Sequence, residues 1–256
     1  MTADTVIARK DKSIGWMTFS HPARHNALTD AMGAHITEIL ADFAADPEIR
    51  LCVMTGAGDK AFISGADIGG LPSARRSDGD PPPLSQAIQA LDAFEKPLVA
   101  MIRGWCLGGG LAVALKADLR ICASDARFGV PAARLGIGYP LDLMTDLVAV
   151  AGPSAAKTML FTAERLPADQ ALRIGLVDEV VAPEALEQRV SQIAGAIAQN
   201  APLSIRAAKA SVNHLMRGRP AADAVQALVA GCMTSADFEE GRAAFLEKRA
   251  PVFRGV

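Results

Sequence analysis

Aromatic and cysteine side chains are scarce in this sequence, and their scarcity excludes several kinds of protein. The chain has 256 residues but only one tyrosine, two tryptophans and four cysteines. So few rings argue against an aromatic stacking platform for nucleic-acid bases. The cysteines are widely separated and form no CxxC pair, so we expect reduced, mostly buried thiols in a cytoplasmic protein. They are Cys52, Cys106, Cys122 and Cys232.

Charge of one sign and long apolar runs are also missing. The net charge is −2, and the nearest approach to a basic run is the pair Arg75 and Arg76. We therefore expect neither nucleic acid nor an anionic membrane as a partner. No stretch approaches the roughly 20 uncharged apolar residues of a membrane span. Residues 1–15 contain no apolar core of signal-peptide length, which predicts a protein made without such a signal.

What the sequence does contain is typical of a globular α/β protein. Half of the residues are hydrophobic and 21% are charged. Strand-like and helix-like segments alternate through the first part of the chain, which favours a parallel sheet with right-handed crossovers. We expect a hairpin over 5–20 and strands over 50–55, 98–102 and 120–124. One helix is expected to begin within 26–30, and two more are expected over 84–94 and 111–119.

The pattern changes beyond Gly152, where nearly every segment has helical periodicity and residues 176–181 (LVDEVV) are the single strand candidate. A helical tail beside an α/β core often serves assembly. We divide the chain into a core over 1–195 and a C-terminal helical region over 196–256. Residues 71–83, rich in glycine, proline, serine and aspartate, are predicted to form a surface loop.

A run of three glycines, Gly108, Gly109 and Gly110, precedes one of the predicted helices. Glycines cost conformational entropy, so a physical reason for three of them is expected. They let a ligand approach the backbone, and the helix that follows offers unpaired N–H groups and a positive dipole end. These features indicate an anion or oxyanion site. The alternative is a tight strand-to-helix turn under close packing.

A second glycine-bearing turn, residues 64–68 (SGADI), follows another apolar run. One interpretation is that the amide of Ala66 points outward in the same way, and the alternative is an ordinary turn with Asp67 capping a helix. The pair of turns is more informative than either alone, because two backbone donors from separate loops are what an oxyanion hole requires. A metal site is not expected: Pro22 separates His21 from His25, so a helix does not bring them together.

Several short segments repeat, in order and spacing, the pattern of one known family over nearly the whole chain. They are residues 21–28 (HPARHNAL), 61–68 (AFISGADI), 104–110 (GWCLGGG), 117–121 (ADLRI), 126–131 (ARFGVP), 171–178 (ALRIGLVD) and 241–253 (GRAAFLEKRAPVF). On these segments the chain resembles the crotonase family, also called the enoyl-CoA hydratase/isomerase superfamily.

The resemblance implies a ββα-spiral core, a helical C-terminal region used for a homotrimer or a dimer of trimers, and an acyl-CoA thioester as substrate. No cofactor is implied, because coenzyme A enters as part of the substrate. The amides of Ala66 and Gly109 would hold the thioester oxygen. Phe245 and Lys248 would lie near the adenine end of coenzyme A, commonly across a subunit contact. The implied substrate-binding set is Arg24, Ala27, Ser64, Ala66, Asp67, Ile68, Leu107, Gly109, Pro131, Leu135, Phe245 and Lys248.

The sequence departs from the family pattern at both acid/base positions of its hydratases. The family's two glutamates fall, in ungapped register, on Ala112 and Ala132. Alanine cannot activate water or deliver a proton, so standard hydration of an enoyl-CoA is not expected. We expect isomerisation or another step that needs one acid/base group, the work of an acyl-CoA isomerase or lyase. The alternative is a protein that binds acyl-CoA without catalysis.

Two residues further along are candidates for the proton carrier. Some family members draw an aspartate from this loop, and that position falls on Pro140, two residues before Asp142. Asp142 reaches the acyl pocket only if the loop bulges; otherwise it is the N-cap of the following helix. Tyr139 is a candidate donor or weak acid, with a buried ring and a satisfied hydroxyl as the alternative.

Overall fold

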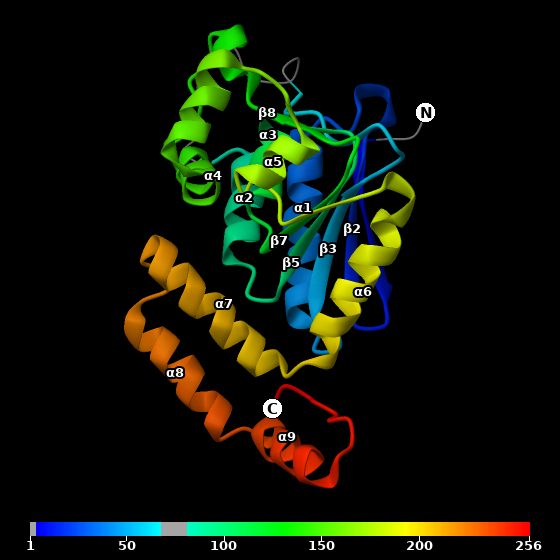
Figure 1. Ribbon diagram of the computed structural model, residues 1–256, viewed down its shortest axis with the longest axis vertical. Coiled ribbons are helices and arrows are strands. Elements are labelled where there is room, and N and C mark those ends of the chain that lie inside the picture. The colour runs from blue at the N-terminus through cyan, green and yellow to red at the C-terminus, as the bar shows by residue number, and fades with distance from the viewer. Residues whose placement is uncertain (1–3, 68–80) are drawn as a thin grey trace.

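Residues 4–67 and 81–256 are described by the computed structural model, and they form two sheets with helices around them (Figure 1). The larger sheet has the order β1-β2-β3-β5-β7-β10, and the smaller has the order β4-β6-β8-β9. The strands are β1 Thr5–Asp11, β2 Ile14–Ser20, β3 Leu51–Gly56, β4 Ala61–Ile63, β5 Leu98–Ile102, β6 Trp105–Leu107, β7 Leu119–Ala123, β8 Arg127–Gly129, β9 Leu166–Pro167 and β10 Glu179–Val181.

The chain winds as a repeating unit of two strands and a helix. In each repeat one strand joins each sheet before a helix follows: β3, β4 and α2, then β5, β6 and α3, then β7, β8 and α4. This is the predicted ββα spiral, and the α/β fold class is confirmed. The helices are α1 Asp30–Ala45, α2 Pro83–Ala93, α3 Gly109–Ala114, α4 Leu141–Thr162, α5 Ala168–Arg173, α6 Leu186–Gln199, α7 Pro202–Arg217, α8 Ala222–Met233 and α9 Ala236–Glu247, with short 3₁₀ turns η1 Pro22–Arg24, η3 Pro131–Leu135 and η4 Pro183–Ala185.

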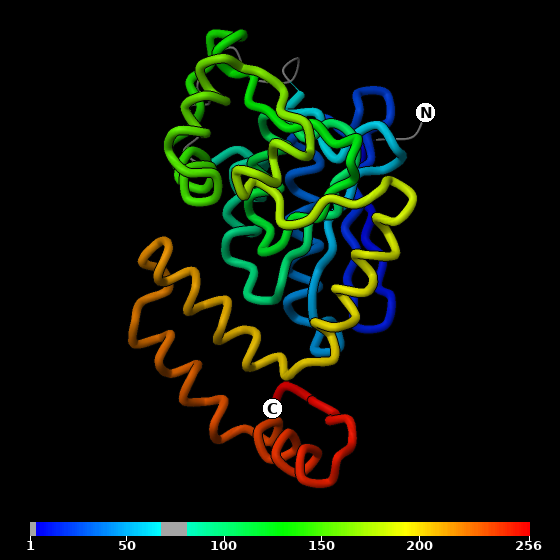
Figure 2. The backbone as a smooth tube through the Cα atoms, viewed as in Figure 1, coloured from blue at the N-terminus to red at the C-terminus, as the bar shows by residue number. Residues whose placement is uncertain are grey.

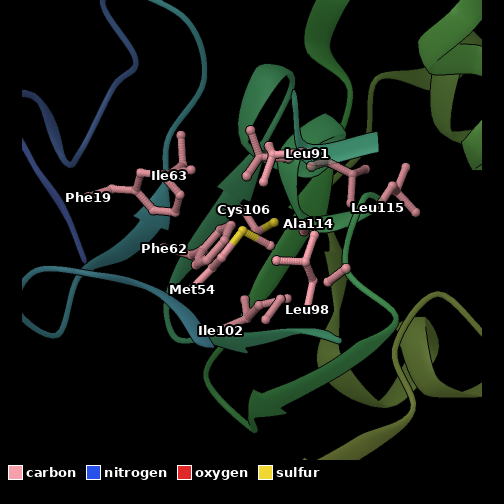
Figure 3. Packing of buried hydrophobic residues seen from close by; sticks show 14 of the residues in the cluster. Phe19, Met54, Phe62, Ile63, Leu91, Leu98, Ile102, Cys106, Ala114 and Leu115 are labelled. Carbon is pink, nitrogen blue, oxygen red and sulfur yellow. The ribbon is translucent and has the colours of Figure 1, made fainter. Parts of the chain in front are cut away.

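The core follows from the alternation of side chains along the central strands. On β3, Leu51 and Val53 pack toward α6, whereas Cys52 and Met54 point into the larger cluster between the sheets. Figure 3 shows Met54 beside Phe62 of the smaller sheet. Every one of these side chains is fully buried. The strand therefore joins two cores, which explains why it reads as a continuous apolar run.

Most predicted elements of the first part are confirmed. The hairpin over 5–20 is β1 and β2 in antiparallel pairing. Helix α1 begins after Thr29, whose side chain accepts a hydrogen bond from the Met32 amide, and it ends before Asp46. The strands expected over 50–55 and 98–102 are β3 and β5.

The helix predicted over 111–119 is wrong in its bounds, because α3 ends at Ala114. Tertiary contacts end it: the Lys116 side chain turns inward to two carboxylates, and Asp118 accepts a hydrogen bond from the Leu98 amide (2.7 Å). The strand expected over 120–124 consequently starts one residue earlier, at Leu119. The C-terminal part also holds a second short strand, β9, whose two residues pair with β8 and are too few to give a pattern.

The last three helices project from the core as an arm (Figure 2). Helix α6 lies against the larger sheet and runs through position 195, and α7 starts the projecting part. The division between 195 and 196 stays a prediction. In the described ranges, no helix is long and apolar enough to cross a bilayer.

Candidate active site

The carboxyl ends of three parallel strands define the candidate site. Strands β4, β6 and β8 are parallel neighbours in the smaller sheet, so the segments that follow them leave from the same edge. Ligands of open α/β sheets bind at such edges. The glycine-bearing turn after β4 and the triple glycine after β6 are therefore brought together by the sheet itself.

Backbone hydrogen bonds fix the direction of the Ala66 amide. The Gly65 carbonyl accepts from the Leu28 amide, and the Leu28 carbonyl accepts from the Asp67 amide, both at 2.8 Å. In a trans peptide the C=O and N–H groups point in opposite directions. Because the Gly65 carbonyl faces Leu28, the Ala66 N–H faces away from it.

Each glycine of the triple run has its own physical reason. Gly108 has φ +51° and ψ −114°, a conformation that side chains rarely adopt. A Cβ on Gly110 would lie 2.2 Å from the Ile63 carbonyl oxygen, so α3 packs directly on β4 only because this position is glycine. Gly109 is the first residue of α3, so its N–H has no acceptor within the helix.

The two predicted donors lie side by side. A Cβ on Gly109 would stand 3.3 Å from the Ala66 nitrogen and 3.7 Å from the Ala66 Cβ. The Gly109 amide therefore starts a helix, and the Ala66 amide faces away from Leu28. Because Gly109 has no side chain, the space beside the Ala66 nitrogen stays open. Two such donors can hold one oxygen that carries developing negative charge.

We expect a Gly110→Ala variant to be destabilised by about 1–3 kcal/mol, the usual cost of overpacking. The added methyl meets backbone on β4, which cannot rotate out of the way as a side chain would. The midpoint of urea unfolding measures the change. Gly231→Ala on α8 is the control, since its Cβ meets nothing within 4 Å; equal stability of the two variants would contradict the packing argument.

Several predicted substrate-binding residues surround the two amides. Ser64 donates its hydroxyl to the Arg24 carbonyl (2.9 Å), and its amide donates to the His25 carbonyl (3.1 Å). The exposed Arg24 guanidinium pairs with the Asp67 carboxylate and crosses from η1 to the Ala66 turn. Ala27 is buried between these segments.

The remaining predicted wall comes from β6 and from η3. Leu107 is buried at the end of β6, Pro131 packs near Gly108, and Leu135 is half exposed on η3. Ile68 lies outside the described residues, as does most of the loop predicted over 71–83.

The two alanines that the resemblance assigns to the hydratase acid/base positions lie next to the site. Ala112 is buried on α3, one turn after Gly108 and Gly109. Ala132 is half-buried on η3, directly after Pro131. Neither place holds a group that can carry a proton.

Tyr139 and Asp142 stand at the entrance to α4. Helix α4 begins at Leu141 with Pro140 as its N-cap, so the alternative that made Asp142 the N-cap is wrong; Asp142 is exposed in the first turn. A proline ends the preceding loop there because its fixed φ suits the residue before a helix.

The Tyr139 hydroxyl is buried and has no hydrogen-bond partner among the described residues, so the alternative of a satisfied hydroxyl is also wrong. Burial raises the pKa of Tyr139, and the charges of Asp146, Cys106 and Asp142 raise it further. At neutral pH this group is a neutral donor and not a base.

Phe245 and Lys248 lie far from these residues within one chain. Both belong to the end of α9, at the far end of the arm from α3 (Figure 1). Phe245 is 83% exposed. A role for either side chain in binding thus requires a second subunit.

A buried ionic cluster escaped the sequence analysis. The Lys116 Nζ lies 2.9 Å from a carboxylate oxygen of Asp92 and 2.8 Å from one of Asp146. The guanidinium nitrogens of Arg217, on α7, lie 2.6 Å from Asp92 and 3.0 Å from Asp146. These groups come from three helices and from the turn after α3, and no spacing along the chain connects them. Asn26 was also absent from the predicted site, although its place within a polar stretch before a helix is a weak signal of a special backbone position.

A cavity of about 800 Å³ lies away from the glycine turns, between α2 and the α7–α8 pair. Its lining includes Asp92, Arg206, Lys209 and Leu228. The cavity is the space beneath the projecting arm, and it contains neither Ala66 nor Gly109. Among the described residues, no cluster of three or more His, Cys, Asp or Glu side chains is placed to hold a metal ion.

Comparison with known proteins finds one family. Residues 9–256 match the family model described as enoyl-CoA hydratase/isomerase. The chain is 36% identical to a crotonyl-CoA hydratase of Syntrophomonas wolfei over 257 residues, covering 99% of each chain. It is 32% identical to a carnitinyl-CoA dehydratase of Citrobacter koseri, covering 93% of this chain and 94% of that one.

Solved structures are similar over the whole length as well. A crystal structure of an enoyl-CoA hydratase/carnithine racemase from Magnetospirillum magneticum superposes with a TM-score of 0.90 at 31% identity. The match covers 100% of this chain and 97% of that one.

Proposed function

The chain belongs to the enoyl-CoA hydratase/isomerase family, and from this premise we propose that it binds an acyl-CoA thioester and stabilises its enolate between two backbone amides. The observation that carries the proposal is the side-by-side placement of Ala66 and Gly109 at the ends of parallel strands. Hydrogen bonds from both amides would polarise the thioester carbonyl. Polarisation makes the α-proton removable, and one such donor typically contributes about 3 kcal/mol to lowering the barrier.

The reaction we propose uses a single acid/base group, as in shifting a double bond along an acyl chain. Relatives named hydratase or dehydratase add or remove water, which calls for both an acid and a base. Ala112 and Ala132 leave both of those places without a proton carrier. The protein is accordingly an isomerase or lyase acting on acyl-CoA rather than a standard hydratase.

Asp142 is the proposed base, and Tyr139 is the proposed donor beside it. A carboxylate in the first turn of α4 can accept the α-proton and return it to the γ-carbon, two carbons further along the chain, so that the double bond moves into conjugation with the thioester. The raised pKa of Tyr139 keeps its phenol protonated, so it donates a hydrogen bond and does not compete as a base. Its unpartnered hydroxyl has the capacity for such a bond.

We expect Asp142→Asn to lower kcat for isomerisation of a 3-enoyl-CoA by about 100-fold, the effect of losing a general base. Asparagine keeps the shape of the side chain but cannot accept the proton. The rate is followed by absorbance of the conjugated 2-enoyl-CoA product. Asp169→Asn on α5, an exposed partner of Arg173 away from the site, is the matched control.

Full activity of Asp142→Asn would remove Asp142 from the mechanism and leave Tyr139 to be tested as Tyr139→Phe. Efficient hydration of crotonyl-CoA by the wild-type protein would contradict the one-group reaction. Either result leaves the thioester-binding part of the proposal intact.

A second candidate function is binding of acyl-CoA without catalysis, which the two alanines also favour. Calorimetry that shows acyl-CoA binding, together with no product after long incubation, would support it. Turnover of any thioester would exclude it.

Assembly into a homotrimer or a dimer of trimers is proposed on the apolar side chains of the arm. Leu215 is 82% exposed, and Leu246, next to Phe245 on α9, is 71% exposed. Covering these side chains with a second copy would also bring Phe245 and Lys248 toward a neighbour's substrate. Sedimentation velocity measures the assembly. A cytoplasmic location is proposed on the four free cysteines.

A further inference from the structure

The side chain of Asn26 uses its amide to join three segments. Its Nδ2 donates to the carbonyls of Ala57 (3.0 Å) and Ala61 (2.8 Å), and its Oδ1 accepts from the His21 amide (3.0 Å). The residue is 1% exposed and has φ +60°. Both donors of the amide are used, and no water reaches it to replace a lost bond.

These bonds hold the residues after η1 against the start of β4. Ala57 lies in the turn after β3, and Ala61 begins β4. The fit is close: a Cβ on Gly56 would lie 2.8 Å from the Asn26 Nδ2 and 2.1 Å from the Ala61 carbonyl oxygen. The side-chain amide of Asn26 thus fills the space between the carbonyls of Ala57 and Ala61 and the backbone N–H of His21.

The residue that orients the proposed oxyanion donor, Leu28, lies two positions after Asn26. Leu28 donates to the Gly65 carbonyl (2.8 Å) and thereby turns the Ala66 N–H away from itself. The Ser64 amide donates to the His25 carbonyl, so residues on both sides of Asn26 hold the Ala66 turn. A shift of this segment would rotate the peptide between Gly65 and Ala66.

We infer that Asn26 is a positioning residue that aims the Ala66 amide at the substrate carbonyl, acting through Leu28 and without touching substrate. The inference rests on the proposed function, because it needs a thioester oxygen between Ala66 and Gly109. In Asn26→Asp the side chain keeps its shape but loses the N–H donors that bind the carbonyls of Ala57 and Ala61. The aspartate carboxylate also places a negative charge next to these two carbonyl oxygens. Glycine takes φ +60° without strain and removes the amide altogether.

The test measures polarisation of a bound thioester in wild type, Asn26→Asp and Asn26→Gly. The probe is butyryl-CoA carrying carbon-13 at the thioester carbonyl, whose NMR shift moves downfield when the oxygen accepts strong hydrogen bonds. We expect the folded variants to lose more than half of the bound-minus-free shift of wild type. Their calorimetric affinity for coenzyme A, which has no acyl carbonyl, is expected to stay within about twofold of wild type, well under 1 kcal/mol.

Thr55→Val is the matched control. It removes a side-chain hydrogen bond to the Met101 carbonyl (3.1 Å) on the neighbouring strands, and that bond has no connection to Leu28. The control is expected to keep the full carbonyl shift.

Three results would overturn the inference. The first is that folded Asn26 variants keep the wild-type carbonyl NMR shift. The second is that affinity for coenzyme A and for butyryl-CoA falls equally while this shift is unchanged, and the third is that neither variant folds. In the last two cases Asn26 serves the fold alone. Absence of any shift in the wild-type protein would instead refute the oxyanion hole itself, so the two failures are distinguishable.

Discussion

Gly109→Ala is expected to lower kcat on a 3-enoyl-CoA by about 1000-fold, the upper end of what loss of an oxyanion-hole donor costs. The added methyl stands 3.3 Å from the Ala66 nitrogen, in the space that we propose for the substrate oxygen. Gly109 opens α3 without a positive φ, so alanine brings no backbone strain there, although its Cβ meets the Ala66 nitrogen more closely than in ordinary van der Waals contact. Steady-state kinetics with the wild type alongside measure the loss.

Gly195→Ala is the control for that experiment. Position 195 lies within α6 and its Cβ would meet nothing within 4 Å. We expect Gly195→Ala to keep full activity. Its free energy of unfolding is expected to rise by up to about 1 kcal/mol, because alanine favours the helix more than glycine does. A Gly109→Ala enzyme with the same folded structure and an undiminished rate would show that no substrate oxygen binds beside Ala66.

The largest expected loss of stability follows from Lys116→Ala. The Lys116 side chain is 6% exposed and that of Asp146 only 4%. Breaking a buried ion pair costs about 3–5 kcal/mol because it leaves a charge uncompensated. We expect the lower end of that range, since Arg217 still contacts both Asp146 and Asp92.

Urea denaturation at a fixed protein concentration measures the change. Arg173→Ala is the comparison, because it breaks an exposed pair with Asp169 and is expected to cost at most about 0.5 kcal/mol. Equal stability of the two variants would show that the cluster contributes no more than a surface pair.

The cluster also joins the arm to the spiral. Burial of Asp92 opposes its ionisation, but Lys116, Arg217 and Arg219 outweigh this effect and hold its pKa below the usual range. Asp92 stands on α2, Lys116 follows α3, Asp146 is on α4 and Arg217 ends α7. The orientation of α7, and with it the apolar surface proposed for assembly, depends on charges buried next to the core.

Local patterns were sufficient where the chain's own neighbours decide the structure. The hairpin, the cap of α1 by Thr29 and the apolar strand β3 depend on alternation and on side chains a few residues apart. Spacing also picked out both glycine turns, because glycine directly after a strand marks a place where the backbone turns sharply or is approached closely.

Local patterns failed where distant residues decide. Helix α3 stops at Ala114 because Lys116 and Asp118 find partners on other elements. Strand β9 exists only as a partner for β8. The alternatives for Asp142 and Tyr139 failed for the same reason: the chain before α4 is placed by packing and not by its own capping pattern.

By itself, then, the sequence determined the fold class, the family and the pair of glycine turns, since each follows from short segments and their order. The prediction that Ala112 and Ala132 stand in place of two acids also came from the sequence. Tertiary structure alone decided that the Ala66 nitrogen lies against Gly109, that Leu28 turns the Ala66 amide away from itself and that the Tyr139 hydroxyl is buried without a partner among the described residues. The reason is that a hydrogen-bond direction is set by the peptide on the facing segment, and only the folded chain brings that peptide into place.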